Sequence, residues 1–561
     1  MLAERRPAIL AVRPEVGFPP FVNQQLRREL GAGHAIIRTM PTLSSWLRYT
    51  IAMLLVALVS GCASLPENAG REPSTALGDT DATRLGRSVS PRAKANPGLS
   101  GIYPLPNARD AFAARVLLAR TAERSLDLQY YVWHDDTTGR LLFSEVWQAA
   151  ERGVRVRMLL DDANTKGMDP AIATLDAHPN IEVRLFNPFA NRGFRLGDFA
   201  ADFARVNRRM HNKSFTADNQ VAVVGGRNVG DEYYGAGTDV GFVDLDVMVV
   251  GPVVRDVSRE FDLYWNSEPA FAAARVVAPV SQGDAGAVRD GWEAVRSQPD
   301  AQRYVDAVRE TPLVRQLLEG GLDIEWTTAT VIHDDPMKVR HPPEESDTHL
   351  LPHLERAMGR PARELDLVSP YFVPGTDGVE GLTTLGARGV RVRVLTNSLA
   401  GTDVGIVHAG YSKYRQPLLA GGTRLYELKA QPEGRRGVQE KERRGLASSS
   451  ATGLHAKTFV VDRRRIFVGS FNLDPRSNRL NTEMGVVIDS PKLASLLAEE
   501  FDRRIPFYAY EVRLAPDGNG LEWIDRQSGR QETILTTEPN SDIWHRGWIQ
   551  FMSVLPIEWL L

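Results

Sequence analysis

The chain has 561 residues, with 67 lysines and arginines against 70 aspartates and glutamates, and a formal net charge of −3. A chain of this length can bury a large core or several domains, and the slight acidic balance argues against a dedicated nucleic-acid binder. The single cysteine excludes an internal disulfide, and the 11 histidines form no cluster with zinc spacing, so we expect no metal and no cofactor.

A short apolar run at 51–59 follows Arg48 and leads into Val-Ser-Gly-Cys, which ends at Cys62. A basic flank, a short hydrophobic segment and small residues predict a secretory signal, and the run is shorter than the roughly 20 apolar residues of a membrane span. The last four residues resemble a bacterial lipoprotein box, which implies lipidation of Cys62 and a place in the cell envelope. The alternative is a core segment that ends in an incidental cysteine. Residues 1–39 would precede the basic flank of such a signal, so Met40 is a candidate for the true first residue.

Residues 62–100 are rich in proline, serine, glycine and threonine and predict a flexible tether. Helices and strands alternate over residues 101–270, which predicts an α/β domain with a mixed or parallel sheet. The expected elements are helices at 107–123 and 143–152 and strands at 126–133, 154–162 and 181–186.

The strongest signal is a duplicated motif, MHNKSFTADNQVAVVGGRNV at 210–229 and LHAKTFVVDRRRIFVGSFNL at 454–473. Each copy predicts a hairpin in which the histidine and the lysine lie on a strand and share one face. Imidazole can attack phosphorus or move a proton, whereas lysine and asparagine suit phosphoryl oxygens. One copy would be ordinary surface chemistry, but two copies with every spacing matched predict two halves of one site. The catalytic candidates are His211, Lys213, Asp218, His455, Lys457 and Asp462, and the phosphate-binding candidates are Asn228 and Asn472.

A carboxylate follows each motif and precedes a short apolar run, namely Asp246 in VDLDVMVVG and Glu483 in LNTEMGVVID. We expect these two carboxylates to orient the histidines by binding their second ring nitrogen. Asp244 is the rival of Asp246, and for both positions the alternative is a solvated charge at a strand end. His134, which follows the first predicted strand, stays outside the expected catalytic set.

Residues 271–345 have no repeat partner and predict a connecting segment with a polar helix at 285–308. Residues 346–510 then repeat the first half, since LDLVSPY mirrors LDLQYY and GVRVRV mirrors GVRVRM. The two halves are therefore an internal duplication, and a pseudo-twofold arrangement would bring both histidines to one cleft.

Two further segments leave alternatives open. The polar loop at 431–452 is either a disordered insertion or a mobile basic flap for anionic headgroups. The tail at 511–561 ends in aromatic residues that suit docking onto the core, which we favour, or a membrane interface. These apolar residues are Trp544, Trp548, Phe551, Leu555, Trp559 and Leu560.

The paired motifs resemble those of the phospholipase D superfamily, and stretches such as LDLQYYVWHDD are most similar to bacterial cardiolipin synthases of the C type. The resemblance runs from about Ala108 to Phe507. It implies two duplicated phospholipase D-like α/β sandwich domains with a pseudo-twofold shared active site. It also implies a phosphohistidine mechanism, in which His211 is the nucleophile, His455 is the acid and base, and Asp218 and Asp462 brace the loops.

The resemblance implies transfer of a phosphatidyl group to phosphatidylglycerol, with phosphatidylethanolamine as donor in C-type enzymes. Water as acceptor would instead give a hydrolase, and a phosphodiester nuclease would use the same motifs. A non-catalytic envelope-binding protein would be expected to lose a motif histidine or lysine, and this chain keeps all four. The expected partners are phospholipid substrates and a membrane reached through the lipid anchor, with no nucleic acid; an accessory protein is left open.

Overall fold

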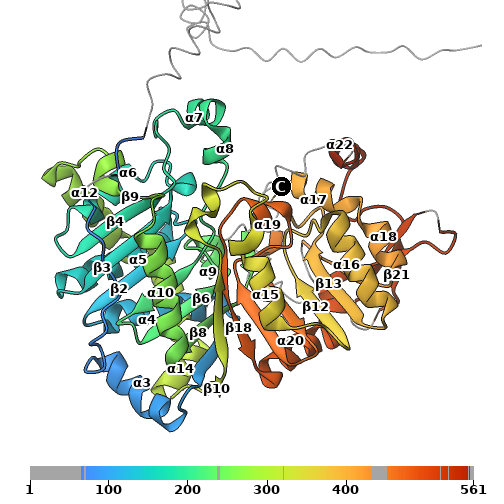
Figure 1. The fold of residues 1–561 in the computed structure, drawn as a ribbon, viewed down its shortest axis with the longest axis horizontal. Helices are drawn as coiled ribbons and strands as arrows, with labels where there is room; N and C mark the ends of the chain where they lie inside the picture. The colour runs from blue at the N-terminus through green and yellow to red at the C-terminus, as the bar shows by residue number, and fades with distance from the viewer. Residues whose placement is uncertain are drawn as a thin grey trace, which may run out of the picture. The chain divides into compact units, whose positions relative to one another are not determined.

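The computed structural model describes residues 65–68, 71–236, 240–319, 321–402, 404–430, 451–518, 520–527, 530–553 and 555. The predicted signal and lipidation site at Cys62, the loop at 431–450, and Trp559 and Leu560 lie outside these residues. Figure 1 shows the described part as two α/β halves side by side.

The first half is built on one large sheet. Its strands are β1 (Ser100–Leu105), β2 (Ser125–Tyr130), β3 (Arg155–Asp161), β4 (Ile181–Phe186), β5 (Ser214–Ala217), β6 (Val221–Gly225), β8 (Asp246–Val250), β9 (Ala270–Ala272) and β10 (Glu325–Thr327). They lie in the order β10-β1-β8-β6-β5-β2-β3-β4-β9. The pairs β2–β3 and β3–β4 are parallel, and the other neighbours are antiparallel.

Helices cover both faces of this sheet. The helices of the first half are α3 (Arg84–Ala95), α4 (Ala108–Thr121), α5 (Thr137–Glu151), α6 (Asp169–Asp176), α7 (Arg195–Ala201), α8 (Phe203–Val206), α9 (Asp231–Tyr234), α10 (Pro252–Trp265), α11 (Ala273–Val276), α12 (Gln282–Arg296), α13 (Pro299–Arg309) and α14 (Pro312–Leu318). Alternation along β2 explains the layers, because Leu126 and Leu128 join the apolar core that includes α4 and α5. Asp127 points to the opposite face, where Arg157 bridges it to Asp262 of α10 with both ion pairs at 2.7 Å.

The second half repeats this plan. Its strands are β11 (Ala329–His333), β12 (Glu364–Val368), β13 (Arg391–Asn397), β14 (Arg424–Leu428), β16 (Lys457–Val461), β17 (Arg465–Gly469), β18 (Met484–Asp489), β19 (Ala509–Leu514), β20 (Leu521–Asp525) and β21 (Thr533–Leu535). Its helices are α15 (Leu350–Met358), α16 (Gly375–Ala387), α17 (Gly405–Ser412), α18 (Arg415–Ala420), α19 (Pro475–Arg479), α20 (Pro491–Arg503), α21 (Ile505–Tyr508) and α22 (Ile543–Ser553). The order β18-β17-β16-β12-β13-β14-β19 matches β8-β6-β5-β2-β3-β4-β9, so the expected duplication of α/β domains is confirmed.

The two halves share a core and a small sheet. Apolar residues of β6 and β8 pack with those of β16, β17 and β18 in one buried cluster. A short parallel pair, β7 (Val240–Val243) with β15 (Ala451–Leu454), joins the halves directly. Within the described ranges, no helix combines the length and the apolar character that a membrane span needs.

The segment 62–100 is not a free tether where the structure describes it. The N–H of Ser74 donates to Oδ1 of Asn266 at 3.1 Å, and the N–H of Ala76 donates to Oδ2 of Asp262 at 2.9 Å. The expectation of a flexible tether is therefore wrong for this part, because its backbone groups bind Asp262 of α10 and Asn266, which follows that helix. A composition rich in small polar residues does not reveal such partners.

Candidate active site

Each motif forms a hairpin whose turn is held by the motif aspartate. Asp218 has a φ of 52°, and its Oδ1 accepts hydrogen bonds from the N–H groups of Arg124 at 2.8 Å and Ser125 at 3.0 Å. Asp462, with a φ of 54°, binds the start of β12 in the same way. Both aspartates lie at the end of the hairpin away from the histidines. They brace the turns through these hydrogen bonds, which is the role that the resemblance implied for them.

The histidines precede the strands on which we expected them. The backbone N–H of His211 donates to Thr482 O at 2.8 Å, and that of His455 donates to Val243 O at 2.8 Å. Pairing within each hairpin starts only at Ser214 and Lys457, because the backbone before these residues bonds to the opposite half. Each histidine is thus fixed by both halves at once.

Each imidazole also binds a carboxylate from the other half of the chain. Nδ1 of His211 lies 2.8 Å from Oε2 of Glu483, and Nδ1 of His455 lies 2.6 Å from Oδ2 of Asp244. Both carboxylates are completely or almost completely buried. A carboxylate on Nδ1 fixes the tautomer and leaves Nε2 as the reactive nitrogen.

The carboxylate on His455 is that of Asp244, so the expectation for Asp246 is wrong. Asp246 pairs instead with the buried guanidinium of Arg115 at 2.9 Å. Strand register explains the difference. Asp246 lies opposite the motif glycine Gly225, a place that Gly485 takes in the second half, opposite Gly469, so that Asp244 corresponds to Glu483. The sequence prediction chose Asp246 by its distance from the apolar run that follows it, whereas the strand register identifies Asp244.

A glycine lets Asp244 approach the site. A Cβ at Gly226 would lie 2.3 Å from Oδ1 of Asp244, so no larger residue fits there without a shift. The second half has Ser470 at this position, and its hydroxyl donates to Oε2 of Glu483. Ser477 of α19 donates to Oε1 of the same carboxylate at 2.7 Å. Sequence reasoning missed both serines, although the Gly/Ser difference inside the repeated motif pointed to Ser470.

The motif lysines are buried beside the motif histidines. Lys213 and Lys457 are each 1% exposed, and each Nζ donates to the carbonyl oxygen of its own motif histidine. Burial holds the pKa of Lys213 well below its ordinary value, although the charge of Glu483 opposes this effect. The Lys213 ammonium also lies 5.4 Å from the centre of the Tyr131 ring.

The two histidine–carboxylate pairs differ in their electrostatics. Burial, together with the motif lysines, lowers the pKa of His211 well below 6.5 and brings the pKa of His455 to about 4. Burial raises the pKa of Glu483 to about 7. Burial also opposes ionisation of Asp244, but the adjacent His455 and Lys457 outweigh it and lower the pKa of Asp244 to about 2. Of the two carboxylates, Asp244 is therefore more strongly ionised than Glu483.

The asparagines that follow the hairpins are also buried. Asn228 is 1% exposed, and its Oδ1 accepts a hydrogen bond from Val132 N at 3.2 Å. Asn472 is 3% exposed, and among the described residues its Oδ1 has no hydrogen-bond partner. Side-chain amides in these positions have donor capacity to offer a ligand.

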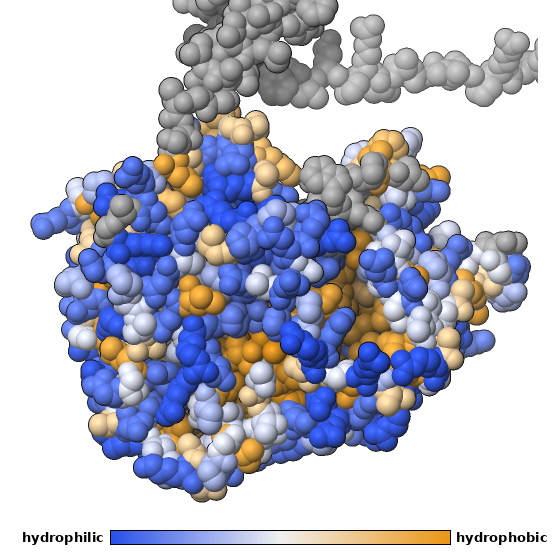
Figure 2. Space-filling view, viewed as in Figure 1, coloured by the Kyte–Doolittle hydropathy of each residue, from blue (hydrophilic) through white to orange (hydrophobic). Residues whose placement is uncertain are grey.

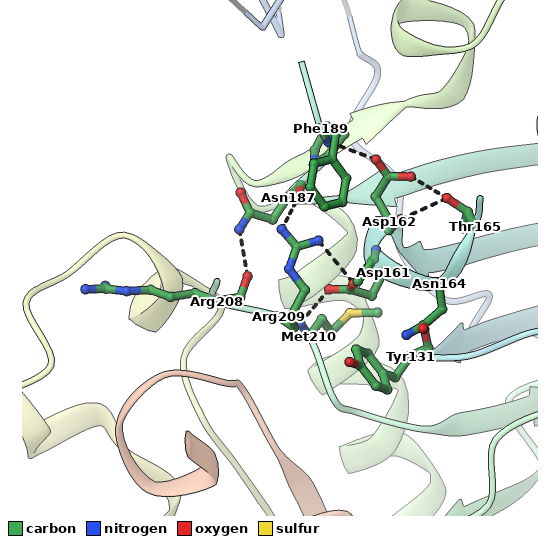
Figure 3. A network of polar contacts seen from close by, with 12 residues as sticks. Tyr131, Asp161, Asp162, Asn164, Thr165, Asn187, Phe189, Arg208, Arg209 and Met210 are labelled. Atoms are coloured by element: carbon green, nitrogen blue, oxygen red, sulfur yellow. Dashed lines mark hydrogen bonds and ion pairs between the residues drawn. The ribbon is translucent and has the colours of Figure 1, made fainter. Parts of the chain in front are cut away.

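Aromatic rings and a polar network complete the surroundings of the histidines. The ring of Tyr131 lies 4.9 Å from that of His211. In the network of Figure 3, Asp161 accepts hydrogen bonds from Met210 N at 2.7 Å and from Nη1 of Arg209 at 3.2 Å, which fixes the two residues before His211. Around His455, the rings of Tyr233 and Phe242 lie at 5.1 and 5.2 Å. No periodic signal in the sequence identified these neighbours.

Comparison with known proteins shows the family to which the chain belongs. The family model described as "Cardiolipin synthase, PLD-like domain" matches residues 117–265 and 354–505. The chain is 44% identical over 479 residues to cardiolipin synthase C of Escherichia coli (strain K12), covering 85% of this chain and 100% of that relative. It is 27% identical over 403 residues to cardiolipin synthase A of Pseudomonas syringae pv. syringae, covering 71% and 68% of the two chains. The crystal structure of phosphatidylserine synthase from Haemophilus influenzae covers 84% of this chain and 100% of its own, with a TM-score of 0.51 and 13% identity, and so shares the fold.

The fold and the paired motifs define an enzyme of the phospholipase D superfamily, a phosphatidyltransferase. Within that superfamily, the chain belongs to the family of cardiolipin synthases with a PLD-like domain.

Proposed function

We propose that this enzyme makes cardiolipin by transferring a phosphatidyl group from a phospholipid donor to phosphatidylglycerol through a phosphohistidine. The name and the 44% identity of the Escherichia coli relative support this choice of product. The observation that carries the mechanism is the crossed pairing of His211 with Glu483 and of His455 with Asp244, since it makes two half-sites into one.

In the first step, Nε2 of His211 attacks phosphorus and the bond from phosphorus to the leaving alcohol breaks. His455 donates its Nε2 proton to the departing oxygen. In the second step, the acceptor hydroxyl gives its proton to His455 while its oxygen attacks phosphorus and the P–N bond breaks, which restores both histidines. The groups proposed to bind the non-bridging oxygens are Lys213, Lys457, Asn228 and Asn472.

The electrostatic difference between the pairs supports this division of roles. A nucleophile must be neutral, and the lowered pKa of His211 keeps it so near pH 7. A general acid must hold a proton, and the ionised Asp244 at 2.6 Å stabilises the imidazolium form of His455. The pKa of about 4 belongs to His455 without a ligand, and the negative charge of a bound phosphodiester raises it.

We further propose that lipidation at Cys62 holds the enzyme on a membrane of the cell envelope. The support for this is the apolar run and the lipoprotein-type sequence before Cys62. Anchoring would keep the site near donor and acceptor lipids, both of which reside in a bilayer.

The test is expression of the parent chain, His211→Ala and His455→Ala in cells that lack other cardiolipin synthases, followed by mass spectrometry of membrane lipids. Cardiolipin from the parent chain and from neither variant is the expected result. Phosphatidic acid in its place would indicate a hydrolase. If a well-expressed, membrane-located parent chain changed no lipid, the synthase proposal would fail and nuclease assays would follow.

A further inference from the structure

An apolar ridge is formed by α7, which follows β4, and by the residue before this helix. Phe194 is 53% exposed, Leu196 is 75% exposed, and Phe199 is 37% exposed while its ring leans on that of Phe189 at 5.6 Å. We call Phe194, Leu196 and Phe199 the first ridge. Single exposed apolar side chains are common, but three on one short stretch are a feature that calls for a partner.

A second ridge stands on α22. One face of this helix docks on the protein, because Ile549 is 4% exposed and packs with Leu399 and Ala409. The opposite face holds Trp544, Trp548 and Phe551, which are 86%, 58% and 55% exposed. The tail therefore docks on the core through one face only. The core docking that we favoured for Trp544, Trp548 and Phe551 is wrong, because these three aromatic residues point outward; we call them the second ridge.

Both ridges are at the end of the sheets where the histidines lie, which is the carboxyl end of the parallel strands. The first follows the carboxyl end of β4, and α22 packs on α17, which follows the carboxyl end of β13. His211 stands before β5, whose first residue Ser214 pairs with Gln129 near the carboxyl end of β2, and His455 stands likewise beside the end of β12. In Figure 1, α7, α8 and α22 project from the same side of the two halves, and Figure 2 shows hydrophobic residues at both projections.

The charge near the ridges is mostly paired. Residues 192–209 contain five arginines and two aspartates, but four of these arginines form ion pairs, namely Arg192 and Arg195 with Asp162, Arg205 with Asp202, and Arg209 with Asp161. Residues 543–555 contain one arginine and neither aspartate nor glutamate. The ridges are therefore distinguished by their exposed aromatic and apolar side chains, which match the interface of a phospholipid bilayer.

We propose that the two ridges dock on the surface of a phospholipid bilayer, so that substrates enter the site from the membrane plane. This inference rests on the proposed function, because it assumes that donor and acceptor are bilayer lipids. The ridges enter the headgroup region without spanning it, and they orient the edge that contains both histidines toward the lipid.

Quenching of tryptophan fluorescence by brominated lipid tests the contact in the full-length chain. Vesicles of phosphatidylethanolamine that contain brominated phosphatidylglycerol should quench the parent chain, whereas vesicles with unbrominated phosphatidylglycerol should not. The double variant Trp544→Phe, Trp548→Phe should lose the part of the quenching that these two residues contribute. Trp326→Phe on β10 is the matched control, and its fluorescence should be quenched to the same extent as that of the parent chain. Equal quenching of the parent and of the double variant would overturn the proposal.

Activity gives a second and separate readout. The double variant Leu196→Ser, Trp548→Ser should transfer phosphatidyl groups about tenfold more slowly in vesicles, but at the parent rate with monomeric short-chain lipids. Phe507→Ser removes a 42% exposed residue of α21 and should change neither rate. Equal losses on both substrates, or a change of oligomeric state in the ridge variant, would assign the ridges to folding or self-association and overturn membrane docking. If the parent chain makes no cardiolipin while quenching persists, the proposed function fails and the docking surface stands.

Discussion

Replacing Asp244 by asparagine removes the charge that faces Nδ1 of His455 and keeps the size of the side chain. The two groups are 2.6 Å apart at their closest atoms and both are buried. At an effective dielectric constant of about 20, unit charges about 4 Å apart attract each other by about 4 kcal/mol. If His455 must become an imidazolium in the reaction, we expect Asp244→Asn to lower the rate of phosphatidyl transfer about a thousandfold.

Asp246→Asn is the matched control, because it makes the same chemical change two residues away. Asp246 neutralises Arg115, which is 1% exposed, and breaking such a buried pair costs about 3–5 kcal/mol of stability. Single-turnover transfer should therefore fall mainly in Asp244→Asn, whereas urea unfolding should change mainly in Asp246→Asn. Transfer by Asp244→Asn within a few-fold of the parent rate would refute the reasoning, as would an equally inactive but fully folded Asp246→Asn.

Three further predictions concern charge and stability. Burial raises the pKa of Glu260 from 4.5 to about 7, so its stabilising contribution is fully present below about pH 4.5 and is lost as pH rises through 7. The parent chain should therefore lose about 3 kcal/mol of unfolding free energy over this range, and Glu260→Gln should not show this loss. Urea unfolding of both chains at pH 4.5 and pH 8 measures the difference. Lys213→Met removes a cation from the site and should lower kcat by a factor of about 10² to 10³ and raise the pKa of His211, which the pH dependence of transfer measures; an unchanged pH profile would argue against this contact. Asp218→Asn and Asp462→Asn each weaken three N–H···carboxylate contacts at a hairpin turn. Each should lower the free energy of unfolding by about 1–3 kcal/mol, while the folded protein keeps its transfer rate. Lost activity at unchanged stability would instead indicate a catalytic role for these aspartates.

The duplication could be predicted from the sequence because it rests on local spacing. The step from His211 to Lys213 to Asp218 repeats at His455, and repeated spacing implies repeated structure whatever the packing. The strand patterns of each half were also local, and the two sheets confirm them.

The choice between Asp244 and Asp246 depended instead on contacts between distant parts of the chain. Both residues precede the same apolar run, and only the register of β6 with β8 decides which one faces the site. The prediction of a flexible tether was wrong for the same reason, since the partners of Ser74 and Ala76 are almost two hundred residues away in the sequence. Non-local pairing of this kind leaves no trace in composition or in periodicity.

The crossing of the two half-sites carries the whole mechanism, and the covalent intermediate tests it most directly. The full-length His455→Ala variant would be incubated with a donor phospholipid labelled in its phosphate, quenched at alkaline pH, and digested for mass spectrometry. We predict an acid-labile phosphatidyl adduct that forms slowly on the peptide that contains His211 and then persists, because the variant keeps the nucleophile but loses the group that protonates the leaving alcohol and activates the acceptor. An adduct on His455 in the reciprocal His211→Ala variant, or cardiolipin formation by the parent chain with no adduct on either histidine, would contradict the account.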